Sequence, residues 1–158
     1  MIKLSALFAI LVAPAFASCP DPTRQEGAVY NATGAELLAP RTFAVTAGGG
    51  LPVPCVDFVD ADPSLLREEL VGFMSGEPTA VIELEGMAPH ILTVSARAEC
   101  GPVLTVHASD GQWYFGEFSD AGQAVTLWGA PDGPLRVWVG STTLAQCEGA
   151  FTLETFDR

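Results

Sequence analysis

Two histidines and a few serines are the residues that could support nucleophilic catalysis in this chain. A serine peptidase needs a serine nucleophile, a histidine base and an orienting carboxylate. The histidines are His90 and His107, and each lies in an alternating, strand-like run. Ser75 lies in Phe-Met-Ser-Gly-Glu and Ser109 in His-Ala-Ser-Asp-Gly, so neither has the flanking pattern of a known nucleophile. We therefore predict that the chain is not a peptidase, and a secreted hydrolase is the alternative.

Clustered aspartates are the residues that could bind a metal ion. Asp57, Asp60 and Asp62 could offer, from one loop, the hard oxygen ligands that calcium prefers. A second group could do the same from another loop: Asp110, Glu117 and Asp120. The spacing is not that of an EF-hand, because Pro63 follows Asp62 with no glycine at the turn position. Calcium at Asp57, Asp60 and Asp62 is thus a hypothesis, and the alternative is that aspartates here cap turns and helices.

Aromatic residues gather in the C-terminal half and could stack on sugar rings. They are Trp113, Tyr114, Phe115, Phe118, Trp128 and Trp138. Alternation puts Trp138 on the side of its run opposite the aliphatic residues, which predicts that it points outward. Trp113, Tyr114 and Trp138 are the candidate binding residues. The alternative is that these rings pack in the core or along strand edges.

The first seventeen residues have the organisation of a signal peptide. Lys3 gives a positive start, an apolar run follows, and Ala15-Phe16-Ala17 is a small-x-small cleavage sequence. Cleavage there leaves a single domain, residues 18–158, which is predicted to be periplasmic or secreted. The apolar run is shorter than the roughly 20 residues that a membrane span needs. A lipid anchor on Cys19 is the lesser alternative, because Phe16 stands where lipid-modified proteins usually carry Leu or Val.

The mature chain is strongly acidic. The full chain carries a net charge of −12, and loss of Lys3, its single lysine, leaves six arginines against nineteen acids, or −13. Such a surface repels nucleic acid and anionic lipid, and it is compatible with cations or basic partners. The simpler interpretation is a solvated acidic surface.

Four cysteines remain after cleavage, and export makes disulfides their default state. They are Cys19, Cys55, Cys100 and Cys147. Three pairings are possible. We favour Cys19–Cys55 and Cys100–Cys147, because each pair brackets one half of the chain. The wide spacing argues against a zinc site or a redox dithiol.

Short strands separated by glycine- and proline-rich turns account for most of the mature chain. At least seven runs alternate or are β-rich, and they include residues 42–46, 79–84, 90–98, 103–108, 124–128, 135–140 and 150–156. Asp110-Gly111 is a strong hairpin signal. Residues 57–75 are ambiguous: Asp62 could cap a short helix that begins at Pro63, or the segment could be a strand. The pattern predicts an all-β, antiparallel, disulfide-stabilised sandwich.

The end of the chain resembles the pre-peptidase C-terminal domain of bacterial secreted proteins. Residues 133–140 resemble its "G-x-Y-x-V-x-V" strand, and residues 151–156 resemble its final "Y-x-L-x-V" strand. Residues 104–113 resemble its "D-L-x-V … D-G" hairpin. The chain also resembles small exported bacterial proteins that carry "F-x-V-x-A-G-G" (residues 43–49 here) and "D-G-x-W-x-F" (residues 110–115), which are often labelled serine peptidases by transfer.

The resemblance implies an Ig-like or jelly-roll-like sandwich and a non-catalytic appendage, and it implies nothing about proteolysis. Residues 60–74 depart from the family pattern. We therefore expect an exported binding or accessory module, without a required cofactor, whose partner is an envelope or extracellular protein or a polysaccharide. A structural envelope protein is a further alternative.

Overall fold

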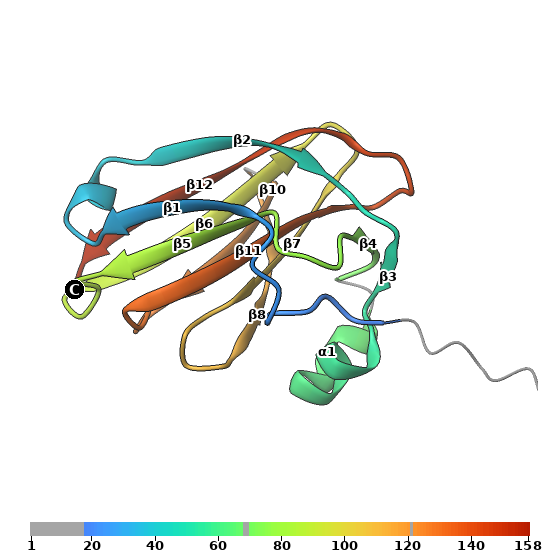
Figure 1. The fold of residues 1–158 in the computed structure, drawn as a ribbon, viewed down its shortest axis with the longest axis horizontal. Coiled ribbons are helices and arrows are strands. Elements are labelled where there is room, and N and C mark those ends of the chain that lie inside the picture. The colour runs from blue at the N-terminus through green and yellow to red at the C-terminus, as the bar shows by residue number, and fades with distance from the viewer. Residues whose placement is uncertain (1–17, 68–69, 121) are drawn as a thin grey trace, which may run out of the picture.

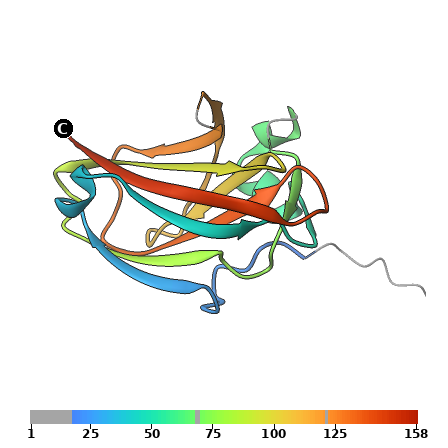
Figure 2. The ribbon, with the colours of Figure 1, turned by 90° about the horizontal axis from the view of Figure 1, so that it is seen from above.

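Two β-sheets packed face to face form the fold (Figures 1 and 2). The computed structural model describes residues 18–67, 70–120 and 122–158. The predicted signal peptide, residues 1–17, lies outside them. The predicted all-β sandwich is confirmed, as is the pairing of Cys19 with Cys55 and of Cys100 with Cys147. The two disulfides indicate an oxidising, exported environment.

The first sheet, sheet A, is built around the long strand β11. Its strands are β1 (Ala28–Thr33), β3 (Leu51–Val53), β4 (Gly72–Met74), β5 (Ala80–Glu85), β7 (Pro102–His107), β8 (Trp113–Phe115) and β11 (Gly133–Ser141). One side of β11 pairs with β5 and β4, and the other side pairs with β7, which continues into β8 through the predicted turn at Gly111. The edge strand β1 runs parallel to β5.

The second sheet, sheet B, has the strand order β2-β12-β6-β10-β9. Its strands are β2 (Arg41–Ala47), β6 (His90–Ala98), β9 (Glu117–Ser119), β10 (Gly122–Leu127) and β12 (Cys147–Asp157). The pairs that hold it together are all antiparallel. The predicted alternation is confirmed, because Leu92, Val94 and Ala96 of β6 are fully buried between the sheets.

Helical segments are short, and they include a six-residue helix that the sequence did not predict. They are η1 (Glu36–Leu38), α1 (Val56–Ala61) and η2 (Pro63–Arg67), of which η1 and η2 are 3-10 helices. The alternative of a strand at 63–67 is wrong: the chain turns there, and Asp62 Oδ1 accepts a hydrogen bond of 2.9 Å from the Ser64 N–H. None of the described helices is long and apolar enough to cross a bilayer.

A second, smaller core lies on the face of sheet A that points away from sheet B. Its buried residues are Val53, Cys55, Phe58, Leu65, Leu70, Met74, Val103 and Trp138. On β11 the side chains of Val137 and Val139 enter the main core, and Trp138 between them enters this second core. Alternation therefore placed Trp138 on the correct face of the sheet, but the prediction that it points to solvent is wrong, because Trp138 is fully buried. The segment that contains α1 and η2 covers it.

Candidate functional site: an aromatic hollow at the crossing between the sheets

The chain crosses from sheet A to sheet B at Gly116, between β8 and β9. The Gly116 N–H donates to the Leu104 carbonyl at 2.8 Å. A Cβ at this position would lie 2.8 Å from Gln123 Oε1 and 2.9 Å from Leu104 Cβ, so only glycine fits without displacement. The buried Gln123 of β10 also accepts the Leu104 N–H at 2.7 Å. These contacts hold the end of β8 against β9 and β10.

A hollow of about 400 Å³ opens beside this crossing. Residues of both sheets line it: Tyr114, Phe115, Glu117, Phe118, Ser119, Ala124, Val125, Thr126 and Trp128. Phe118 and Trp128 are 71% and 72% exposed, among the most exposed large hydrophobic residues described. A hollow lined by two exposed aromatic rings and by hydroxyl and carboxylate side chains has the chemistry of a binding site.

Tyr114 is held in this hollow by contacts at both its ring and its hydroxyl. Its ring packs partly against the main core, and its hydroxyl donates to Asp110 Oδ2 at 3.0 Å. Burial, and then the Asp110 carboxylate, raise the pKa of Tyr114 above its ordinary value, so the hydroxyl stays protonated at neutral pH. Tyr114 therefore gives the hollow a rigid wall with a hydroxyl fixed by its own partner.

The three aromatic residues predicted to bind a ligand do not lie together. Only Tyr114 lines the hollow. Trp138 is buried in the second core, where its surface is inaccessible to a sugar ring. Trp113 is half-buried, with its ring centroid 4.7 Å from that of Phe58 and 5.1 Å from that of Trp138. Phe118 and Trp128 belong to the same aromatic group in the sequence, and these two rings are the ones that the fold leaves exposed on the hollow.

The acidic residues proposed for calcium do not form a ligand set. No three His, Cys, Asp or Glu side chains within residues 18–67, 70–120 and 122–158 come together as a metal-binding group, and Asp57, Asp60 and Asp62 lie in those ranges. Hydrogen bonds from the Ser64 side chain and backbone lower the pKa of Asp62, which caps η2. In the second group, Asp110 accepts from the Gln112 N–H at 2.9 Å and from Tyr114. The alternative reading of these aspartates, as caps of turns, describes Asp62 and Asp110.

Ser75, Ser109 and His90, which were considered for catalysis, contact other partners in the structure. The hydroxyls of Ser75 and Ser109 each donate to a backbone carbonyl, of Glu77 and Asp132 respectively, at 2.6 Å. His90 is buried, with its Nδ1 3.2 Å from Asp157 Oδ1. Nδ1 makes no hydrogen bond within the described residues, so the two side chains are in contact without a hydrogen bond between them.

A block of buried polar atoms underlies the second core. Thr105 Oγ1, His107 Nδ1, Arg136 Nε and Trp138 Nε1 are all buried without a hydrogen-bond partner among the described residues. They come from two neighbouring strands, because Arg136 is opposite His107 and Trp138 is opposite Thr105. The Trp113 ring covers this block at 4.7 Å from the His107 ring. Buried unpaired polar groups cost free energy, so this block is a weak point of the fold.

The stability of the protein should fall in mildly acidic solution because of His107. Burial, and next the Arg136 guanidinium, lower the pKa of His107 below its ordinary 6.5, and Asp110 and the Gly111 backbone oppose this. Below pH 6.5 the unfolded chain therefore binds the proton more readily than the folded one, and stability declines as pH falls. Thermal melting from pH 8 to pH 5 should show this decline in the wild type and a weaker one in His107→Gln. Equal slopes for the two proteins would contradict the prediction.

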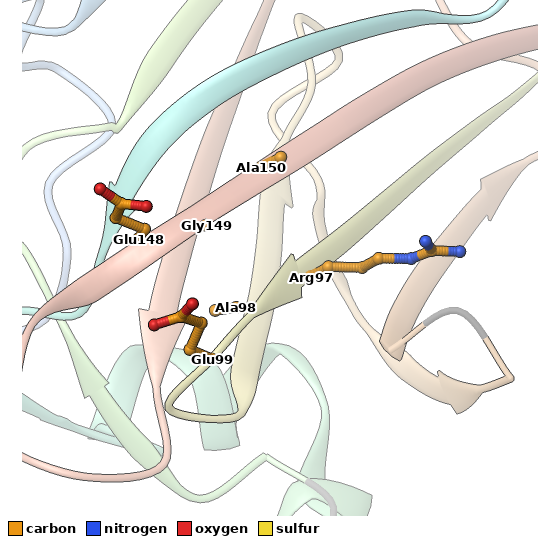
Figure 3. Close-up of a pocket in the computed structure, with 6 residues that line it drawn as sticks. All are labelled: Arg97, Ala98, Glu99, Glu148, Gly149 and Ala150. Carbon is orange, nitrogen blue, oxygen red and sulfur yellow. The ribbon is translucent and has the colours of Figure 1, made fainter.

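A second surface depression, shown in Figure 3, lies where Gly149 of β12 passes β6. Glu99 and Glu148 border it on one side, and the Arg97 side chain extends away from them. The Glu99 N–H donates to the Glu148 carbonyl at 3.3 Å, so the two acids are held near each other by the backbone. The depression is open and lacks aromatic side chains, and it therefore offers less to a ligand than the hollow at Trp128.

No family model and no curated protein matches the chain. The two-sheet sandwich implied by the resemblance to the pre-peptidase C-terminal domain is present, and membership of that family stays a prediction.

Proposed function

We propose that this protein is a non-catalytic binding module that acts after export and holds a polysaccharide in the hollow formed by Tyr114, Phe118 and Trp128. The observation that carries the proposal is the exposure of two aromatic rings on one hollow. The apolar face of a sugar ring packs well on an aromatic ring, and the sugar hydroxyls need polar neighbours at the edges. Glu117, Ser119 and Thr126 are such neighbours.

Charge narrows the class of polysaccharide. The mature chain carries −13, and Glu117 on the rim of the hollow is exposed. An acidic polysaccharide would be repelled by this field. We therefore favour neutral glycans and those with amino sugars. The histidines lend no support to the alternative of a secreted hydrolase, because neither of them contacts a serine hydroxyl through a hydrogen bond in the described residues.

The test is native gel electrophoresis of the mature protein through gels that contain a neutral glucan, a xylan, chitosan or alginate. We expect retardation by at least one neutral or amino polysaccharide and none by alginate. Trp128→Ala and Phe118→Ala should each weaken binding about tenfold, as truncation of a central aromatic contact commonly does. Leu144→Ala is the matched control, since Leu144 is 69% exposed but does not line the hollow. Absence of retardation in all gels, or wild-type retardation of Trp128→Ala, would refute the proposal.

A further inference from the structure

The seven-residue strand β2 (Arg41–Ala47) is an unprotected edge of sheet B. It pairs with β12 in an unbroken antiparallel register from Arg41 opposite Leu153 to Ala47 opposite Cys147, and no strand of the described part of the chain pairs with its other side. Proteins usually shield such an edge with proline, lysine, inward charge or a bulge. The strand has none of these, and its one charged residue, Arg41, donates to the Asn31 carbonyl at 3.0 Å rather than extending across the edge.

The free edge of sheet A lies alongside it. Strand β1 is the end of that sheet, and the ring centroids of Tyr30 on β1 and Phe43 on β2 are 4.5 Å apart. A hollow of about 350 Å³, which we call the edge groove, is lined by both strands, with Ala28 and Tyr30 on one side and Ala44, Val45 and Thr46 on the other. Tyr30 and Val45 are half-buried and pack on the main core. The edge groove thus has the unpaired backbone edge of β2 beside an apolar surface formed by Tyr30 and Val45.

These features match recognition by strand addition. In that mode a peptide gains affinity from main-chain hydrogen bonds to the edge, and alternate side chains enter pockets that give specificity. At about 3.3 Å per residue, the seven residues of β2 can pair with an extended segment of similar length. Side chains at alternate positions would reach Tyr30 and Val45, and the intervening ones would face solvent.

The charges around the edge groove favour a basic occupant. Glu26 and Glu77 border the edge groove, and Glu77 is already paired with Arg24 at 3.2 Å. Glu26 is exposed and has no ion-pair partner among the residues that the structure describes. A second copy of the chain would bring another charge of −13 and a second Glu26 to the same edge, which disfavours self-pairing.

We propose that the edge groove binds an extended basic segment of another exported protein, which adds to β2 as a strand with alternating apolar and Lys or Arg side chains. This site is separate from the aromatic hollow, and it does not depend on the polysaccharide proposal.

Selection of the mature protein against a phage-displayed library of random decapeptides tests the proposal. Enriched peptides should alternate apolar residues with Lys or Arg, and on binding they should slow hydrogen exchange at amides of residues 41–47. Glu26→Lys should weaken these peptides about fivefold to tenfold at low salt, because a rim charge acts mainly on salt-dependent association. The control Glu99→Lys makes the same charge change in the turn after β6, away from β2, and should bind as the wild type does.

Three results would overturn the proposal. The first is the absence of any enriched peptide. The second is enriched peptides that slow exchange elsewhere, for example at β9 and β10. The third is sedimentation of the free protein as a dimer with β2 already protected, which would assign the edge to self-association. Loss of polysaccharide binding in the gel test leaves these readouts unaffected, so the two proposals fail separately.

Discussion

Replacing Phe58 with alanine should lower the free energy of unfolding by about 3–5 kcal/mol, the usual cost of removing a large buried aromatic side chain. Phe58 is fully buried, and its ring lies 4.7 Å from Trp113 and 5.1 Å from Phe115. It is the side chain through which α1 holds the second core against sheet A. A loss of this size is a large part of the roughly 5–15 kcal/mol that keeps a domain folded.

Urea unfolding followed by tryptophan fluorescence measures this effect, because Trp113 and Trp138 report from the second core itself. Val56→Ala is the matched control: Val56 lies on the same helix but is 60% exposed, so its truncation should change stability by no more than about 0.5 kcal/mol. If Phe58→Ala cost less than about 1 kcal/mol, α1 would not be holding the second core, and Trp138 would not depend on it for burial.

The strands and their faces could be predicted from the sequence because burial between two sheets imposes a two-residue period. Leu92, Val94 and Ala96 show the pattern in the sequence and are all buried in the structure. The disulfide pairing was also predictable, since each half of the chain contains two cysteines far apart. The alternation that predicts the strands is a local pattern, and the cysteine pairing depends only on the order of the cysteines along the chain.

The second core could not be predicted, because the helix that covers it, α1, is too short to show the 3.6-residue repeat of apolar residues that indicates a helix. Helix α1 has only six residues, and its sequence, VDFVDA, alternates enough to suit a strand as well. Alternation placed Trp138 correctly on the outer face of β11, and nothing in the sequence indicates that α1 and η2 return to that face. The prediction of solvent exposure failed there for this reason.

The aromatic hollow escaped prediction for a related reason. Phe118 on β9 and Trp128, which directly follows β10, line one hollow only because the chain changes sheets at Gly116 and then turns back into β10. That crossing is a tertiary event, and it depends on close packing at Gly116 and on the reach of Gln123 to Leu104. The sequence shows which aromatic residues are available to stack on sugars. Which of their rings stay exposed depends on tertiary packing.

Removal of the Cys100–Cys147 disulfide should have the other large effect on stability. The bridge closes a loop with a sequence separation of 47, and the chain-entropy relation gives about 4 kcal/mol for a loop of that length. The bridge joins the turn after β6 to the start of β12, and the Cys100 N–H is also 3.1 Å from Cys147 Sγ. Without the bridge, the unfolded chain gains conformational entropy while the folded chain gains little, so the free energy of unfolding falls.

The double variant Cys100→Ala with Cys147→Ala should therefore unfold at much lower urea concentration than the wild type. The matched comparison is Cys19→Ala with Cys55→Ala, whose separation of 36 predicts nearly the same entropic cost. The two should differ in where protection from hydrogen exchange is lost first. The Cys100–Cys147 variant should lose it at the β6–β12 pairing around Gly149 and Ala98, and the Cys19–Cys55 variant should lose it at α1. A wild-type midpoint for the first variant would show that the β12 ladder alone fixes this end of the sandwich.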